Sequence, residues 1–122
     1  MKQIILVFLG GGVGSILRYV ISLLFISNDS VFPKATFIVN LIGSLIIGLL
    51  IGYQLKFQSS NELSLLFITG FCGGFTTFST FSLEAYSLYK AEEWSNLCLY
   101  LGLSISLGII LVGIGVALFQ KH

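Results

Sequence analysis

Residues 70–82 read Gly-Phe-Cys-Gly-Gly-Phe-Thr-Thr-Phe-Ser-Thr-Phe-Ser, and this stretch decides how the chain folds. It lies in a segment without charged residues, Leu63–Leu83, yet it holds three glycines and five hydroxyl side chains. Glycine destabilises a helix and hydroxyl groups compete for backbone hydrogen bonds, so we expect the helix to break near residues 73–77. Inside a membrane such a break persists only where it is buried in protein or lines a cavity. The stretch therefore predicts backbone groups and hydroxyls turned toward a polar site within the bilayer.

Composition and charge distribution place the whole chain in a membrane. Of its 122 residues, 56% are hydrophobic and 9% are charged, whereas a soluble domain carries about 25% charged residues. Four runs hold no charge, namely 3–17, 35–55, 63–83 and 94–120. The last three reach the roughly 20 residues that cross a bilayer, and the first does so if its helix continues past Arg18. We predict a single all-α transmembrane domain over residues 1–122, with helices at about 3–26, 33–55, 62–89 (broken near 73–77) and 94–119.

A cleaved signal peptide is the alternative for the first span, because Lys2 precedes a short apolar stretch. The apolar pattern continues through residues 19–26, and no small-x-small cleavage site precedes a soluble segment. We therefore expect a retained helix. The predicted loops at 27–30, 56–61 and 90–93 are too short to hold a second domain.

Charges and glycines favour an antiparallel dimer. With four spans, three basic residues fall on each side of the membrane: Lys2, Lys56 and Lys121 on one, Lys34, Lys90 and Arg18 on the other. Topology normally follows an excess of Lys and Arg on one side, and here there is none. Either an unseen factor orients the chain, or, as we favour, it inserts both ways and pairs with itself. Glycines at G-x-x-x-G spacing let helices approach closely, within the chain or in a dimer: Gly10 and Gly14, Gly48 and Gly52, Gly70 and Gly74.

The residue inventory speaks against an enzyme. The only histidine is His122, the last residue, and the only aspartate, Asp29, lies in a loop. Neither can build a catalytic triad or a metal site with neighbours at the usual spacing. Cys72 and Cys98 fall inside predicted spans, and we expect them to be buried apolar residues rather than a disulfide or a metal pair. A net charge of +1 gives no basic patch for nucleic acid.

Two sets of residues could serve an ion. Asn40 and Ser44 follow one another at a four-residue step and form a narrow polar strip on a helix, although an intramembrane amide often serves only helix contact. Phe78 and Phe81 lie at i and i+3 on one helix face, a pattern that is more often simple packing. Their position one turn after the break favours a site, because the positive edge of an aromatic ring can hold a partly dehydrated anion.

Three motifs resemble those of one family. The stretch at 70–82 resembles the third-helix signature of the CrcB/Fluc fluoride channels. Gly-Gly-Val-Gly-Ser-Ile-Leu-Arg-Tyr at 11–19 looks like the first-helix motif of that family, and Thr-Phe-Ile-Val-Asn-Leu-Ile-Gly-Ser at 36–44 looks like the second. The resemblance covers essentially the whole chain in order, and its third-helix string is the most specific part.

This resemblance implies an antiparallel homodimer with two pores, in the inner membrane of a bacterium. It also implies a structural sodium ion at the dimer centre, held by backbone carbonyls that map to Gly73 and Thr76, and carbonyls freed by a broken helix suit such a cation. It assigns Arg18 and Glu84 to a vestibule. The residues that it assigns to the fluoride pore are Phe78, Phe81, Asn40, Ser79, Thr80, Tyr100 and Ser104. The family has a polar track at four-residue steps on the fourth helix, from which Gly108 departs.

The implied function is a fluoride-selective channel that lets cytoplasmic fluoride leave passively and protects the cell from its toxicity. Hydrofluoric acid enters neutral and ionises inside, and a negative interior then favours exit of the anion by about 2.3 kcal/mol per charge per 100 mV. One alternative is a dual-topology, proton-coupled exporter of cationic compounds, which needs a carboxylate deep in the bundle. Glu84 is its single candidate and lies near a helix end. The other alternative is a non-conducting structural subunit.

Overall fold

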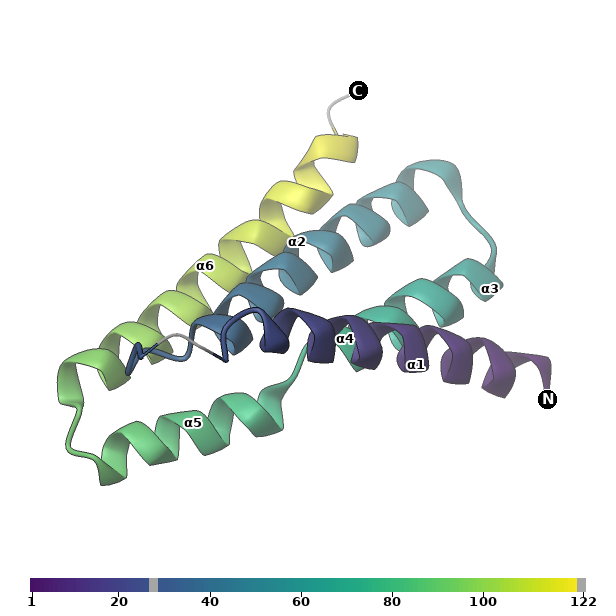
Figure 1. Cartoon of the computed structure of the whole chain (residues 1–122). Coiled ribbons are helices and arrows are strands. Elements are labelled where there is room, and N and C mark those ends of the chain that lie inside the picture. The colour runs from purple at the N-terminus through teal and green to yellow at the C-terminus, as the bar shows by residue number, and fades with distance from the viewer. Residues whose placement is uncertain (27–28, 121–122) are drawn as a thin grey trace.

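Four helical segments that are long and apolar enough to cross a membrane make up the structure, a computed structural model that describes residues 1–26 and 29–120. They are α1 (Lys2–Leu23), α2 (Lys34–Phe57), a composite third span (Asn61–Lys90) and α6 (Trp94–Gln120). Helices α2 and α6 run side by side, and α1 crosses the third span near its middle (Figure 1). The described residues contain no strand, so the predicted all-α fold with four spans is confirmed.

The third span is broken, as its sequence predicts. Along the chain it consists of α3 (Asn61–Leu63), η1 (Ser64–Cys72, a π-helix), α4 (Gly73–Phe75) and α5 (Phe78–Lys90). Thr76 and Thr77, which separate α4 from α5, are extended, with φ and ψ of −78° and 159° and of −148° and 123°. Gly73 and Gly74 remain helical, so the break is shorter than the predicted range and lies on the two threonines. The π-helical winding of η1 was not predicted.

Helix α1 is shorter than predicted, because it ends at Leu23 instead of continuing to residue 26. The backbone N–H groups of Leu24 and Phe25 donate to carbonyls three residues earlier, each at 3.1 Å, and this tighter winding ends the α-helix. The predicted loop at 27–30 begins with two residues that lie outside the described part of the chain. At the opposite end, α2 stops where Gln58 adopts the left-handed conformation with φ 47°.

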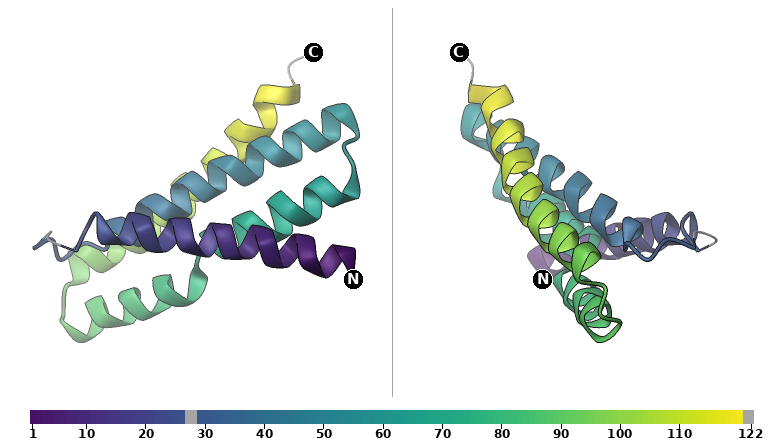
Figure 2. Two further views of the ribbon diagram at one scale, coloured as in Figure 1. Left: turned by 45° about the vertical axis from the view of Figure 1, so that its right-hand side comes forward. Right: turned by 90° about the vertical axis from the view of Figure 1, so that its left-hand side faces the viewer.

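Glycines make the closest helix contacts within the protomer. A Cβ atom on Gly10, Gly14 or Gly74 would overlap backbone atoms where α1 crosses η1 and α4. Where α2 packs along α6 (Figure 2), a Cβ atom on Gly48 would overlap Val112, and one on Gly115 would lie 2.6 Å from the backbone nitrogen of Leu49. All three predicted G-x-x-x-G pairs lie at such intramolecular contacts.

Other glycines face away from the rest of the described chain. A Cβ atom on Gly12, Gly73, Gly102 or Gly113 would meet no heavy atom within 4 Å. Cys98 is exposed as well, so the prediction that both cysteines are buried is right for Cys72 and wrong for Cys98. In hydrocarbon, surfaces of this kind pack against lipid or against another helix.

The charged residues lie toward the ends of the bundle. Lys2 Nζ lies 2.6 Å from Glu62 Oε1, so the start of α1 and the connection between α2 and α3 share one end. Lys34 stands at the start of α2 and Lys90 at the end of α5. Both lie at the opposite end of the bundle from Lys2 and Glu62. Lys121, which the charge tally also uses, lies outside the described residues, as does His122.

Candidate functional site

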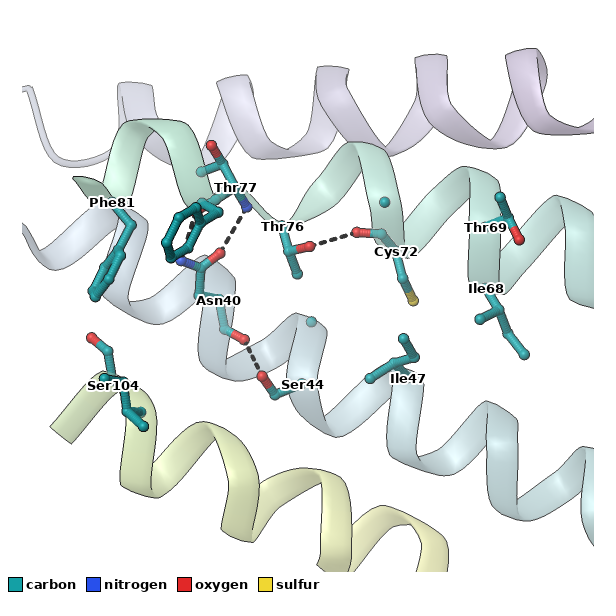
Figure 3. Close-up of a pocket in the computed structure, with 14 residues that line it drawn as sticks. Asn40, Ser44, Ile47, Ile68, Thr69, Cys72, Thr76, Thr77, Phe81 and Ser104 are labelled. Atoms are coloured by element: carbon teal, nitrogen blue, oxygen red, sulfur yellow. Dashed lines mark hydrogen bonds between the residues drawn. The ribbon is translucent and has the colours of Figure 1, made fainter. Parts of the chain in front are cut away.

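Asn40 closes the break in the third span. Its side-chain amide donates from Nδ2 to the carbonyl oxygen of Thr77 at 3.0 Å, while its Oδ1 accepts the backbone N–H of Thr77 at 2.9 Å (Figure 3). A membrane offers no water to backbone groups that lose their helical partners, so a side chain must replace them. One amide on α2 therefore pairs both polar backbone groups of a residue at the break. Whether Asn40 also meets a permeating ion stays a prediction.

Backbone carbonyls lose their helical donors at this break, among them those of Gly73 and Thr76. In an unbroken helix the N–H of residue i+4 bonds the carbonyl of residue i. The N–H of Thr77, which would serve Gly73, donates to Asn40 instead. The N–H of Thr80, which would serve Thr76, donates to Thr77 Oγ1 at 3.2 Å and caps α5. The carbonyls of Gly73 and Thr76 are thus released from the helix ladder, and the α-carbon of Gly73 faces open space.

A cavity of about 520 Å³ lies beside the break, between α2, the third span and α6 (Figure 3). Phe78 and Phe81 both line it, with ring centroids 5.9 Å apart and planes inclined by 36°. Phe81 is buried in the protomer, whereas Phe78 is 79% exposed. The polar lining residues come from three segments of the chain: Asn40, Ser44, Thr69, Thr76, Thr77 and Ser104. Aromatic rings and neutral donors therefore meet around one space, which includes Asn40, Ser104 and the two phenylalanines, and their role in an ion pathway stays a prediction.

A second cavity, of about 300 Å³, contains both residues predicted for a vestibule. Arg18 of α1 and Glu84 of α5 line it together with Thr80 and with Thr77, which also lines the larger cavity. The hydroxyl of Thr77 lies 3.1 Å from that of Thr80 and 3.3 Å from that of Ser79. A chain of hydroxyl groups at the start of α5 thus lies between the two spaces.

Glu84 joins three helices. Its Oε1 accepts the hydroxyl of Thr36 from α2 at 2.8 Å, and its Oε2 accepts the hydroxyl of Tyr100 from α6 at 2.6 Å. Tyr100 is completely buried, with its ring 4.9 Å from that of Phe81. Tyr100 was predicted to line the pore, but it does not line the larger cavity of this protomer. Through Glu84 it holds α5 in place, and its contact with an ion remains a prediction.

Sequence reasoning missed the partners of these residues. Thr36 was not singled out, although its hydroxyl fixes Glu84. Thr77 was predicted only as one of several hydroxyls, although its side chain caps α5 and its backbone accepts one bond from Asn40 and donates one to it. A threonine directly before the first residue of a helix is a typical N-cap, and this signal was available for Thr77. Nothing in the sequence pairs Thr36 with a residue 48 positions away.

Comparison with known proteins identifies the family. Residues 5–116 match the family model described as CrcB-like protein, Camphor Resistance (CrcB). A protein named fluoride-specific ion channel FluC from Azobacteroides pseudotrichonymphae is 48% identical over 122 residues, which cover 98% of both chains. Proteins of the same name from Desulfotalea psychrophila and Bacteroides fragilis are 46% and 43% identical, over 97% and 92% of this chain and 92% and 91% of their own. The chain therefore belongs to the CrcB family.

Proposed function

We propose that this protein is a fluoride-selective channel of the bacterial inner membrane, through which cytoplasmic fluoride leaves passively. The observation that carries the proposal is the cavity at the break, where two phenylalanines and neutral hydrogen-bond donors line one space at membrane depth. Family membership and relatives named fluoride-specific ion channel support the same function. The protein is thus a multi-pass membrane protein whose chemistry is transport rather than catalysis.

The lining of the cavity suits a small, strongly hydrated anion. Fluoride leaves water only if other donors replace its hydration. The hydroxyl of Thr77, which lines the cavity, lies 3.3 Å from that of Ser79 and 3.1 Å from that of Thr80. The rings of Phe78 and Phe81 add positively polarised edges without a fixed charge. A fixed cation would bind the anion too tightly for fast release, because conduction needs binding that is weak enough to let the ion leave. Arg18 stands outside this stretch, where it attracts anions to the entrance.

The protomer is suited to pairing with an antiparallel copy. Phe78 lies at membrane depth on a mostly apolar surface, and its ring has little contact with its own protomer. Gly73, beside the break, leaves a flat surface with no described neighbour, where a second chain can approach closely. The even distribution of basic residues supports insertion in both orientations. In such a dimer the partner would cover Phe78 and close the open side of the cavity.

The break also suits a structural sodium ion. Backbone carbonyl oxygens are suitable ligands for such a cation. The carbonyls of Gly73 and Thr76 fit this role, because the donors that would pair them in a helix are bonded elsewhere. A bound cation would compensate these carbonyl dipoles where two copies of the break meet.

Fluoride efflux from liposomes that contain only the purified chain tests the function. We expect release of fluoride but not of chloride, and we expect Phe78→Ile to abolish it while the protein still assembles. Phe8→Ile is the matched control, because Phe8 is similarly exposed (74%) but lies on α1 and lines neither cavity. Normal efflux in Phe78→Ile would remove this residue from the pathway. A wild-type protein that releases no fluoride would contradict the function itself.

The same preparation separates the alternatives. A proton-coupled exporter of cations would take up a cationic dye when a pH gradient is imposed, and it would depend on Glu84. The bonds from Thr36 and Tyr100 to Glu84 instead support a positioning role for that carboxylate. A non-conducting structural subunit would show neither transport, and its pore phenylalanines would be dispensable for growth in fluoride.

A further inference from the structure

One hydroxyl group that lines the larger cavity forms no hydrogen bond to the described residues of the protomer. Among the described residues, the side-chain oxygen of Ser104 is buried and has no hydrogen-bond partner. Ser104 lies on α6 and lines the cavity opposite Asn40 and Ser44 of α2 (Figure 3). A buried hydroxyl without a partner is unfavourable and indicates a ligand or a water that the protein is built to receive.

One turn further along α6, Gly108 leaves space in front of a second hydroxyl. A Cβ atom on Gly108 would meet a single neighbouring group, Ser44 Oγ, at 3.4 Å. Ser44 lines the same cavity as Ser104. Since glycine carries no side chain, the oxygen of Ser44 stays uncovered where any other residue at 108 would stand against it.

The Ser44 hydroxyl can turn toward that space at little cost. It now donates to the backbone carbonyl of Asn40 at 2.8 Å, four residues earlier on α2. That carbonyl also lies within the continuous helix 34–57, where it accepts the backbone N–H of residue 44. A Ser–carbonyl bond of this kind is an accessory to the helix rather than a requirement. If the hydroxyl rotates, the carbonyl keeps its helical partner.

We propose that Ser44 donates a hydrogen bond to the permeating anion across the cavity from Ser104, with Gly108 keeping Ser44 uncovered. This inference rests on the proposed fluoride conduction and adds a donor, Ser44, that comes from α2 at the position where α6 has none. Because α6 carries no side chain at position 108, the hydroxyl near this position comes from Ser44 of the neighbouring helix α2. A Cβ atom at 108 would stand in van der Waals contact with the oxygen of Ser44, at 3.4 Å, so a hydroxyl carried by residue 108 would lie beside that of Ser44 and can replace it.

Four variants test the exchange by fluoride efflux from liposomes, measured with an external electrode and normalised to the amount of protein inserted. Ser44→Ala removes the hydroxyl, and Gly108→Ala covers it, so each should slow efflux about tenfold, as expected for one hydrogen bond to a charged group. Gly108→Ser covers Ser44 but brings its own hydroxyl, and it should stay near the wild-type rate. The double variant Ser44→Ala, Gly108→Ser should also recover.

Gly102→Ala is the matched control on the same helix, because its Cβ atom would meet nothing within 4 Å, and its rate should be that of wild type. The comparison of Gly108→Ala with Gly108→Ser carries the most weight, because the two side chains differ by one oxygen atom. Equal rates in these two variants, or a wild-type rate in Ser44→Ala, would overturn the inference and leave the channel function intact. A wild-type protein without fluoride efflux would overturn both.

Discussion

The two halves of the third span are held in different ways. The first half, Ser64–Phe75, lies against α1 with backbone on backbone, because Gly14 and Gly74 leave no side chain between the helices. The second half, α5, is held by side chains: Glu84 bonds to α2 and α6, and Phe81 packs on Tyr100. Two extended threonines separate the halves.

This difference fits the roles of the two halves. Close backbone packing fixes the first half rigidly, since no rotamer can relieve an added atom, and this half carries the freed carbonyl of Gly73. The second half carries Phe78 and the cluster of hydroxyl side chains at the start of α5. These side chains must point toward a cavity to serve an ion. Hydrogen bonds aim side chains more specifically than apolar contact does. We therefore expect the first half to be sensitive to added volume and the second half to lost polar groups.

The largest effect is expected at Gly14. In Gly14→Ala the added Cβ atom would lie 2.8 Å from the backbone nitrogen of Phe75. The obstacle is backbone, so we expect destabilisation on the order of 3 kcal/mol or more, at the upper end for overpacking. The thermal midpoint in detergent, read by size-exclusion chromatography after heating, measures it. Gly12→Ala, two positions away with no neighbour within 4 Å, should behave as wild type. Equal midpoints for the two variants would show that α1 does not pack as described.

The next effect is expected at Asn40, which joins α2 to the break. Asn40→Asp keeps an acceptor for the N–H of Thr77 but cannot donate to its carbonyl, and it places a negative charge in the anion's cavity. We expect a loss of about 1–3 kcal/mol for the buried carbonyl left without its partner. We also expect fluoride efflux from liposomes to be abolished while the dimer persists. Asn61→Asp, an exposed change at the start of α3, is the control. Normal efflux in Asn40→Asp would remove Asn40 from the pathway.

Much of this comparison could be predicted from the sequence, because it depends on local patterns. Charge-free runs locate the spans, and the glycines and hydroxyls of residues 70–82 place the break within 73–77, a wider range than the two threonines that form it. The polar partners could not be predicted in the same way. Asn40 meets Thr77 across 37 positions, and Thr36 meets Glu84 across 48. Such pairs form only if each helix is rotated about its own axis by the right angle. The close contacts at Gly10 and Gly48 set these rotations, and they depend on how the helices pack in three dimensions.

The π-helical winding of η1 was beyond prediction for another reason. Its residues 64–72 are mostly apolar and carry no cap or proline that would distinguish a π-turn from an α-turn. Helix propensity differs among such residues by less than about 1 kcal/mol each, so tertiary contact decides the winding. A Cβ atom on Gly70, within η1, would lie 3.1 Å from the α-carbon of Gly10, so the two helices are in close contact here. Contact with α1 therefore accounts for the position of the first half of the third span better than the sequence of that half does.

A smaller effect is expected where α5 is tied to α6. Tyr100→Phe removes the hydroxyl that donates to Glu84 at 2.6 Å and leaves the ring in place against Phe81. Because Glu84 keeps its bond from Thr36 and lines the second cavity, we expect a loss of about 1.5 kcal/mol, the low end for a hydrogen bond to a charged group. Thermal midpoints measure it, and Tyr19→Phe, an exposed tyrosine on α1, is the control. If Tyr100→Phe matched wild type in stability, polar contacts would not be what positions α5.

The smallest effect is expected at Thr77, where the two halves meet. Thr77→Ala removes the oxygen that accepts the N–H of Thr80 at 3.2 Å, and loss of such a cap costs about 1 kcal/mol. Thr77→Ser keeps the oxygen and should retain nearly all of the stability. Both variants keep the backbone groups that Asn40 bonds, so the break itself should survive, whereas the hydroxyl group shared with Ser79 and Thr80 persists only in the serine variant. Fluoride efflux should therefore fall in Thr77→Ala more than its small change in thermal midpoint accounts for. If efflux and stability fell in proportion, or if serine failed to rescue efflux, the hydroxyl of Thr77 would be a helix cap and nothing more.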